Sequence, residues 1–192
     1  KINNSLRLRA SATAYLSRTA GVPTSAYIWT VSTWLKLGQN PGGSTFAIIG
    51  GGNTTPNWLY SYIYSVDGTF QLYAPNTGAT VTLITNQVFR DYSSWYHIVI
   101  AVDTTQATAS NRVKIYVNGV QITSFSTATY PALNATFFWN QNGVAQRIGS
   151  ITGATSTDCY FAEFYGIDGQ QLTPSSFGST NATTGVWQPI KY

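Results

Sequence analysis

The sequence predicts an all-β domain, a two-sheet antiparallel jelly-roll sandwich with at most one or two short helical turns. Three observations lead to this prediction. Short stretches rich in β-branched and aromatic residues recur along the 192-residue chain, each closed by Gly, Pro, Asn or Asp. No stretch has the helical period that crossover connections between parallel strands require. About a dozen strands of ordinary length fit the chain, which favours a sandwich over a small barrel.

The strongest local signal is a two-residue hairpin within residues 112–123. Alternating apolar and polar residues lead to Asn118-Gly119, a pair that suits the tightest hairpin turns, and a second alternating run follows. A second hairpin is expected between residues 58–66 and 69–73, joined at Asp67-Gly68. Further strands are expected at residues 28–37, 45–49, 79–85, 95–102, 145–151 and 160–167.

Helix signals are confined to one place, and three stretches are expected to be loops. Thr173 and Pro174 suit the N-cap and first position of a short helical turn, which Gly178 ends. Residues 40–44, 50–57 and 104–111 are rich in Gly or polar residues. Because loops on a rigid sandwich often carry binding residues, these three are candidates for function.

Composition excludes several function classes. Charged residues make up only 8% of the chain, and the ten Lys and Arg are scattered in sequence, so we expect no nucleic-acid partner. Cys159 is the only cysteine, which excludes a disulfide framework and favours a buried apolar role. The longest aliphatic run, residues 98–102, is far too short to insert into a membrane as a helix. Residues 1–192 are expected to form one domain of a longer chain, because the sequence begins with Lys and contains no Met.

No catalytic constellation is evident. Glycoside hydrolysis requires two carboxyl groups across the scissile bond, but Glu163 is the only glutamate and Asp168 follows it in a turn sequence. His97 has no nucleophile or carboxylate beside it and is expected to be structural. The five aspartates are dispersed, so no cofactor is expected and a structural calcium has no support from their spacing.

Two aromatic segments are candidates for carbohydrate binding. In residues 137–143, Trp139 lies beside amides that include Asn140 and Asn142, which suit sugar hydroxyls, and this set is the first candidate. Trp58 and Tyr60 are the second candidate. Together with Tyr62 and Tyr64 they are expected on one face of a strand, because every second residue of a strand points to the same side. That stripe has two readings: it packs in the core or an oligomer interface, or it forms a sugar-stacking platform on an exposed sheet.

Four stretches follow one another in a familiar order: residues 30–36 with Trp34, residues 95–103 beginning Trp95-Tyr96-His97, residues 113–119 ending Asn118-Gly119, and residues 147–150 with Ile148-Gly149. In this order and spacing they resemble the laminin-G-like, concanavalin A-like lectin superfamily. Residues 14–19 near the start and residues 161–178 and 184–192 near the end resemble, more closely, the lectin-like domains of bacteriophage virion structural proteins. The resemblance implies a virion-surface fibre, decoration or adhesin component. Its expected partners are other virion proteins, copies of itself and host-surface glycans.

The sequence therefore predicts a non-catalytic virion structural protein whose lectin-like domain binds host-surface glycans. The alternative is a secreted cellular carbohydrate-binding module or adhesin, and a glycoside hydrolase-like enzyme comes a distant third. Sequence outside residues 1–192 would discriminate among them, because attachment, secretion or catalytic regions would lie there.

Overall fold

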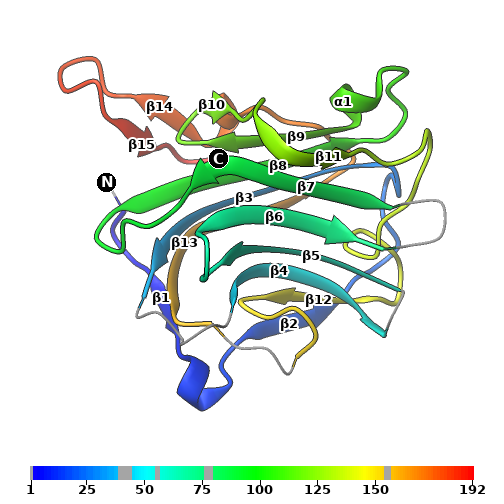
Figure 1. Cartoon of the computed structure of the whole chain (residues 1–192), viewed down its shortest axis with the longest axis horizontal. Coiled ribbons are helices and arrows are strands. Elements are labelled where there is room, and N and C mark those ends of the chain that lie inside the picture. The colour runs from blue at the N-terminus through cyan, green and yellow to red at the C-terminus, as the bar shows by residue number, and fades with distance from the viewer. Residues whose placement is uncertain (1, 39–44, 55–56, 76–79, 154–156) are drawn as a thin grey trace.

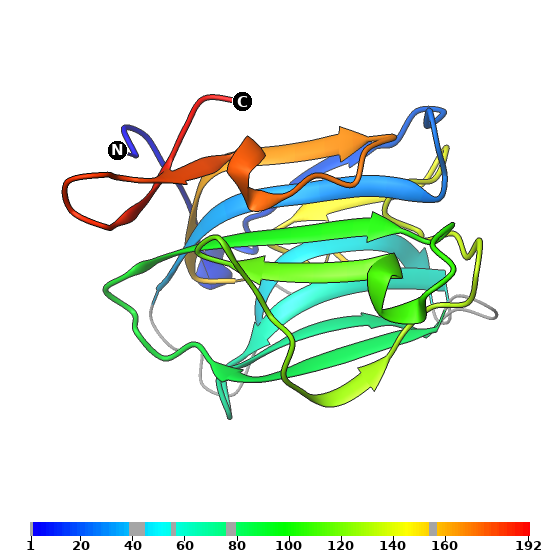
Figure 2. The ribbon, with the colours of Figure 1, turned by 90° about the horizontal axis from the view of Figure 1, so that it is seen from above.

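The computed structural model describes residues 2–38, 45–54, 57–75, 80–153 and 157–192. Two antiparallel sheets of six and seven strands pack face to face, and a two-stranded ribbon lies near the C-terminus (Figures 1 and 2). This arrangement confirms the predicted two-sheet sandwich. The expected loop at residues 40–44 lies outside the described residues.

The six-stranded sheet has the order β1-β13-β3-β8-β9-β10. Its strands are β1 (Leu6–Leu8), β3 (Ile28–Leu37), β8 (Trp95–Asp103), β9 (Val113–Val117), β10 (Val120–Gln121) and β13 (Cys159–Asp168). Strands from the two ends of the chain are neighbours here, since β1 pairs with β13 through Leu6 opposite Phe161. β13 therefore lies between β1 and β3 in the sheet.

The seven-stranded sheet has the order β11-β7-β6-β5-β4-β12-β2. Its strands are β2 (Leu16–Thr19), β4 (Thr45–Thr54), β5 (Asn57–Tyr64), β6 (Thr69–Ala74), β7 (Val81–Val88), β11 (Phe125–Thr129) and β12 (Ala145–Ile148). The middle strands β4 to β7 follow one another in the chain as an antiparallel meander. β5 thus lies at the centre of the sheet.

The core lies between the sheets and is built by residues that alternate along each strand. On β5, Leu59, Ser61 and Ile63 are fully buried, and on β3 the buried large side chains include Trp29 and Leu35. Because successive side chains in a strand point to opposite faces, the residues between these positions point away from the core. Cys159 is buried and unpaired, as expected for a small apolar residue.

The C-terminal segment covers part of the outer face of the six-stranded sheet. The segment contains η2 (Pro174–Ser176), β14 (Gly178–Thr180) and β15 (Trp187–Pro189), shown in orange to red in Figures 1 and 2. Phe177 is buried against Val99, Ala101 and Tyr116, which face outward from β8 and β9. A second, smaller apolar cluster therefore lies outside the sandwich.

The two predicted hairpins differ in their agreement with the structure. Asn118 and Gly119 have φ of 49° and 86° and join β9 to β10 as a two-residue turn, as predicted. The second hairpin forms, but β5 ends at Tyr64, and a four-residue connection replaces the predicted turn at Asp67-Gly68. Within this connection the Gly68 N–H donates to the Tyr64 carbonyl oxygen at 2.7 Å, and the Asp67 carboxylate accepts from the Thr69 N–H at 2.9 Å.

Three local expectations need correction. The helical turn at Pro174–Ser176 is confirmed, but Ala10–Ala12 and Ala109–Arg112 form further short turns, the second within an expected loop. Residues 50–54 belong to β4 and are not a loop. Their glycines serve close packing: a Cβ on Gly50 would collide with the carbonyl oxygen of Ile151, and one on Gly51 with the carbonyl of Phe138.

Candidate functional site

The aromatic stripe of β5 lies on the outer face of the seven-stranded sheet. Trp58, Tyr60, Tyr62 and Tyr64 are all partly exposed, while Leu59, Ser61 and Ile63 between them are buried in the core. The reading in which the stripe packs in the domain's own core is therefore wrong. The stripe remains available for a ligand or for another copy of the chain.

The neighbouring strand β6 extends the stripe into a patch that is two strands wide. Tyr73 on β6 lies opposite Tyr60, with ring centroids 5.3 Å apart. Along β5, the centroid of Tyr60 is 5.6 Å from Trp58 and 5.5 Å from Tyr62. We call Trp58, Tyr60, Tyr62, Tyr64 and Tyr73 the aromatic patch.

The polar groups beside the aromatic patch are hydroxyls and amides, which can form hydrogen bonds with the hydroxyl groups of an uncharged ligand. The Tyr62 hydroxyl donates to Gln71 Oε1 at 2.6 Å, and Gln71 Nε2 donates to Thr69 Oγ1 at 3.1 Å. On the outer face of β6 and β7, the described side chains are Thr69, Gln71, Tyr73, Thr82, Ile84 and Asn86. None of these carries a charge, so the surface offers aromatic faces, hydroxyls and amides.

The phenols of Tyr60 and Tyr62 stay protonated across the physiological range. Burial raises the pKa of Tyr60 above its ordinary value, and the neighbouring Tyr62 and Tyr73 add to the effect. Burial also raises the pKa of Tyr62, with Tyr64 the next largest cause. Each phenol can therefore donate and accept hydrogen bonds without bringing a charge to the surface.

The first candidate set divides between the core and the surface. Trp139 is only 5% exposed and belongs to the main core cluster, with its ring centroid 6.5 Å from that of Phe164. With Leu16, Ile148 and Phe164 it lines a pocket of about 320 Å³. Sugar stacking by Trp139 would need an exposed ring face, and the structure places the ring in the core instead.

Asn140 and Asn142 have different surroundings. Asn140 is nearly buried, and its Nδ2 donates to Ser25 O at 2.9 Å and to Asp168 Oδ1 at 2.8 Å. Both amide hydrogens are thus engaged in holding the Ser25 loop to β13. Asn142 is exposed, so the structure does not assemble Trp139, Asn140 and Asn142 into one open surface.

The acidic residues considered for catalysis also hold structural contacts. Besides Asn140, the Asp168 carboxylate accepts from the backbone N–H groups of Thr24 and Ser25. Burial acts to raise its pKa, but these hydrogen bonds outweigh burial and lower it. Glu163 is exposed and accepts from the Tyr165 hydroxyl at 2.7 Å.

His97 is enclosed by aromatic rings. Its ring is fully buried, with Trp34 stacked at 4.9 Å on centroids and Trp187 at 5.9 Å. Burial lowers the pKa of His97 to about 4. The ring is therefore neutral at neutral pH, so it has no imidazolium proton to give as a general acid, and its burial separates it from a solvent-exposed substrate.

The described residues show neither a metal cluster nor a membrane-spanning helix. They hold no group of three or more His, Cys, Asp or Glu side chains that could bind a metal ion. None of the helices described is long and apolar enough to cross a membrane.

Sequence reasoning missed part of the aromatic patch. Tyr73 and Gln71 were expected only as strand residues, and their link to Tyr60 and Tyr62 depends on the register between β5 and β6. The Asp67-Gly68 connection was the available signal, since a hairpin at that point aligns the two strands. A connection one residue longer or shorter would have placed the other face of β6 beside the stripe.

Comparison with known proteins agrees with the fold. The sequence profile described as Concanavalin A-like lectin/glucanases superfamily matches residues 10–165. A search of curated proteins found no match.

Three solved structures are similar in fold. A SAP-like pentraxin of Limulus polyphemus has a TM-score of 0.56 at 15% identity, over 92% of this chain and 76% of that one. Domain 4 of AbnA, an extracellular arabinanase of Geobacillus stearothermophilus solved with arabinotriose, has a TM-score of 0.57 at 15% identity over 84% of both chains. The mouse laminin α1 LG4-5 domains have a TM-score of 0.60 at 10% identity, over 91% of this chain and 44% of that one.

Proposed function

Because the chain belongs to the concanavalin A-like lectin/glucanases superfamily, we propose that it is a non-catalytic module that binds neutral glycans through the aromatic patch of the seven-stranded sheet. The observation that carries this proposal is the outward orientation of Trp58 and Tyr60 on a central strand. A rigid strand fixes their rings without loop motion, and aromatic residues lose little conformational freedom on binding.

The chemistry of the patch suits a neutral ligand. Aromatic faces stack on the C–H surfaces of sugars, and amides and hydroxyls pair with sugar hydroxyls. Gln71 and the phenols supply such groups beside the rings, and the described outward side chains of β6 and β7 supply no cation to hold an acidic sugar. The expected ligands are uncharged polysaccharides or oligosaccharides.

A binding role accounts for the residues better than a catalytic one. A glycosidase acid must protonate the glycosidic oxygen, with a second carboxylate facing it. Asp168 holds the Ser25 loop, and Glu163 contacts Tyr165 away from the aromatic patch. Neither carboxylate faces the patch rings.

For the biological setting, the proposal is a component of a bacteriophage virion surface. The resemblance of its N-terminal, central and C-terminal motifs to lectin-like domains of phage structural proteins supports this setting. In that role the aromatic patch would bind glycans of the host surface, while other faces of the domain contact virion proteins or further copies.

A secreted carbohydrate-binding module is the second candidate. The similarity to domain 4 of an extracellular arabinanase favours it, since that domain was solved with arabinotriose and matches over most of both chains. Both settings use the same chemistry at the patch. They differ in what the domain is attached to.

The proposal is tested by binding of soluble neutral polysaccharides, namely arabinan, galactan, mannan and dextran, measured by affinity electrophoresis and calorimetry. We expect at least one to bind, and Trp58→Ala and Tyr60→Ala each to weaken that binding about tenfold or more, as loss of a stacking ring removes a main contact. Tyr27→Ala is the matched control, because Tyr27 is a comparably exposed tyrosine outside the patch.

Two outcomes would overturn the proposal. One is the absence of binding to every polysaccharide in the panel. The other is self-association of the chain that Tyr60→Glu abolishes, measured by sedimentation velocity, which would identify the aromatic patch as an interface between copies. Unchanged thermal midpoints for the alanine variants confirm that lost binding does not reflect unfolding.

A further inference from the structure

A row of alternating cations and aromatic rings crosses the outer face of the six-stranded sheet. In the registers of three strand pairs, Arg7 lies opposite Tyr160, Tyr160 opposite Lys36, and Lys36 opposite Trp95. These four residues come from β1, β13, β3 and β8, so the row runs perpendicular to the strands. We call them the cation–aromatic row.

The core-facing neighbours show that the whole row points outward. Leu8, Leu35, Leu37, Cys159 and Phe161, which flank the row along its strands, are buried. Arg7 is exposed, and Tyr160, Lys36 and Trp95 are partly exposed. Alternation along a strand places these two groups of residues on opposite faces of the sheet.

The charged groups of Arg7 and Lys36 form no described ion pair or side-chain hydrogen bond. The Arg7 guanidinium carbon lies 5.4 Å from the centroid of the Tyr160 ring, which orients Arg7 across the face of the sheet. Within the described part of the chain, neither Arg7 nor Lys36 forms an ion pair or a side-chain hydrogen bond. Arg112, by contrast, donates to three backbone carbonyls.

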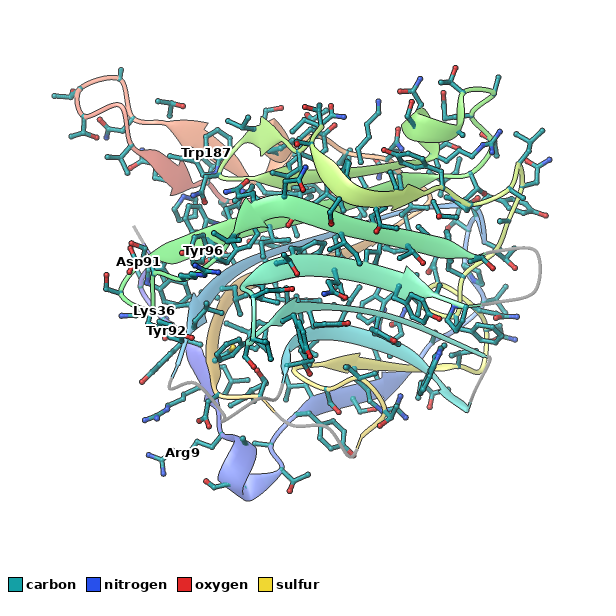
Figure 3. The ribbon with its side chains drawn as sticks, viewed as in Figure 1. Arg9, Lys36, Asp91, Tyr92, Tyr96 and Trp187 are labelled. Carbon is teal, nitrogen blue, oxygen red and sulfur yellow. The ribbon has the colours of Figure 1, made fainter. Side chains whose placement is uncertain are left out.

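The row lies beside the C-terminal segment (η2, β14 and β15) that covers part of the same face of the sheet. The next outward positions along β3 and β8 are Trp34 and His97, and Trp187 of the C-terminal ribbon closes over them. Figure 3 shows Lys36 at the same end of the molecule as Asp91, Tyr92 and Tyr96, with Trp187 above and Arg9 below. The cover thus ends beside the row, and the exposure of Arg7 and Lys36 follows from this.

We propose that the cation–aromatic row is a second binding site, separate from the aromatic patch, for an extended polysaccharide bearing acidic groups at intervals. Each anion pairs with Arg7 or Lys36, and the intervening sugars lie against Tyr160 and Trp95. A guanidinium can hold a carboxylate, phosphate or sulfate through two parallel hydrogen bonds, and an ammonium acts as a point charge.

The spacing of the charges favours an acidic polysaccharide over a nucleic acid. Arg7 and Lys36 lie two strands apart, which corresponds to about 9 to 10 Å. Double-stranded DNA carries one charge per about 1.7 Å of helix axis, and its binding relies on neutralising many phosphates. Two cations separated by a ring match a polymer that has an acidic group on every second sugar.

The test uses hyaluronan oligosaccharides, which carry a carboxylate on every second sugar, with neutral N-acetylglucosamine oligomers as the control ligand. We expect hyaluronan to bind, and Lys36→Gln and Arg7→Gln each to weaken binding about three- to fivefold, the range of an exposed charge pair. Each substitution should also make the affinity less sensitive to salt, because one charge pair fewer is left to be screened. Trp95→Ala should weaken binding and leave the salt dependence unchanged.

The matched control is Lys114→Gln, which removes a cation from the outer face of β9 in the same sheet, outside the row. Hyaluronan binding that falls equally with Lys114→Gln, or that is absent, would overturn the proposal. So would tighter binding of a duplex DNA oligonucleotide that Lys36→Gln weakens. Tyr60→Ala should leave hyaluronan binding unchanged. A wrong proposal for the aromatic patch can therefore be told apart from a wrong proposal for the cation–aromatic row.

Discussion

Trp187 donates its indole N–H to Nδ1 of His97 at 3.0 Å, which fixes the protonation state of the ring and attaches the C-terminal ribbon to the sheet. Indole nitrogen can only donate, so Nδ1 must be the unprotonated acceptor. The proton then lies on Nε2, which donates to the Ser32 hydroxyl at 2.9 Å. A second proton on the ring would place two donors face to face at Trp187.

This contact predicts that the domain loses stability in mild acid. Burial lowers the pKa of His97 to about 4, from an ordinary value of 6.5. The unfolded chain therefore takes up a proton below about pH 6.5 that the folded chain takes up only below about 4. The free energy of unfolding should be fully retained above pH 6.5 and fall by up to ~3 kcal/mol as pH decreases to 4.

Urea unfolding at pH 7, 5.5 and 4.5 measures this loss. His97 is the only histidine in the chain, so no other histidine contributes to that window. His97→Gln retains a group that accepts from Trp187 but cannot titrate, and its stability should be nearly constant from pH 7 to 4.5. An equal acid loss in the wild type and in His97→Gln would show that His97 is not responsible.

Gly178 provides a second prediction about the same ribbon. A Cβ at Gly178 would collide with the Trp187 indole, whereas at Gly166 nothing lies within 4 Å of a Cβ. Gly178→Ala should lower the free energy of unfolding by about 1 to 3 kcal/mol through overpacking. Gly166→Ala should be neutral or slightly stabilising, because it reduces the freedom of the unfolded chain.

Thermal and urea unfolding of the two glycine variants measure the difference. Gly178→Ala should cost less in a Trp187→Leu background than in the wild type, since the smaller side chain leaves room for the methyl group. Equal stabilities of the two single variants would show that Trp187 moves aside at no cost.

Local features of the fold were predictable from the sequence, and those that depend on strand pairing were not. Asn118-Gly119 specifies its own turn, because both residues tolerate positive φ. The alternation of Trp58 and Tyr60 with Leu59 predicted two faces of β5, but it did not tell which face meets the core, since both are apolar. The row from Arg7 to Trp95 required pairings between residues more than 100 positions apart.

Asn140 and Asn142 form a matched pair for the next prediction. Asn140→Ala removes the donors to Ser25 O and Asp168 Oδ1 and should cost about 1 to 3 kcal/mol, because two partly buried acceptors, one of them charged, lose a hydrogen bond. Asn142→Ala alters an exposed side chain and should change stability by no more than about 0.5 kcal/mol. Urea unfolding of both variants at pH 7 distinguishes them, and similar losses would contradict the structural role of Asn140.

Trp139 illustrates how burial excludes a candidate binding residue. Its indole is 5% exposed and packs in the main core cluster, although amides surround it in the sequence. The Gln146 side chain donates to its backbone carbonyl, and Arg18 in turn donates to Gln146 Oε1 at 2.7 Å, so the segment is fastened to β12 and β2. The indole is therefore held as part of the sandwich.

Trp139→Ala should accordingly lower the free energy of unfolding by about 3 to 5 kcal/mol, the usual cost of removing a buried tryptophan. Trp58→Ala on the aromatic patch serves as the control and should cost less, because that ring is partly exposed. Urea unfolding at pH 7 measures both. A Trp139→Ala variant that keeps wild-type stability but loses glycan binding would contradict the core assignment and return the binding site to residues 137–143.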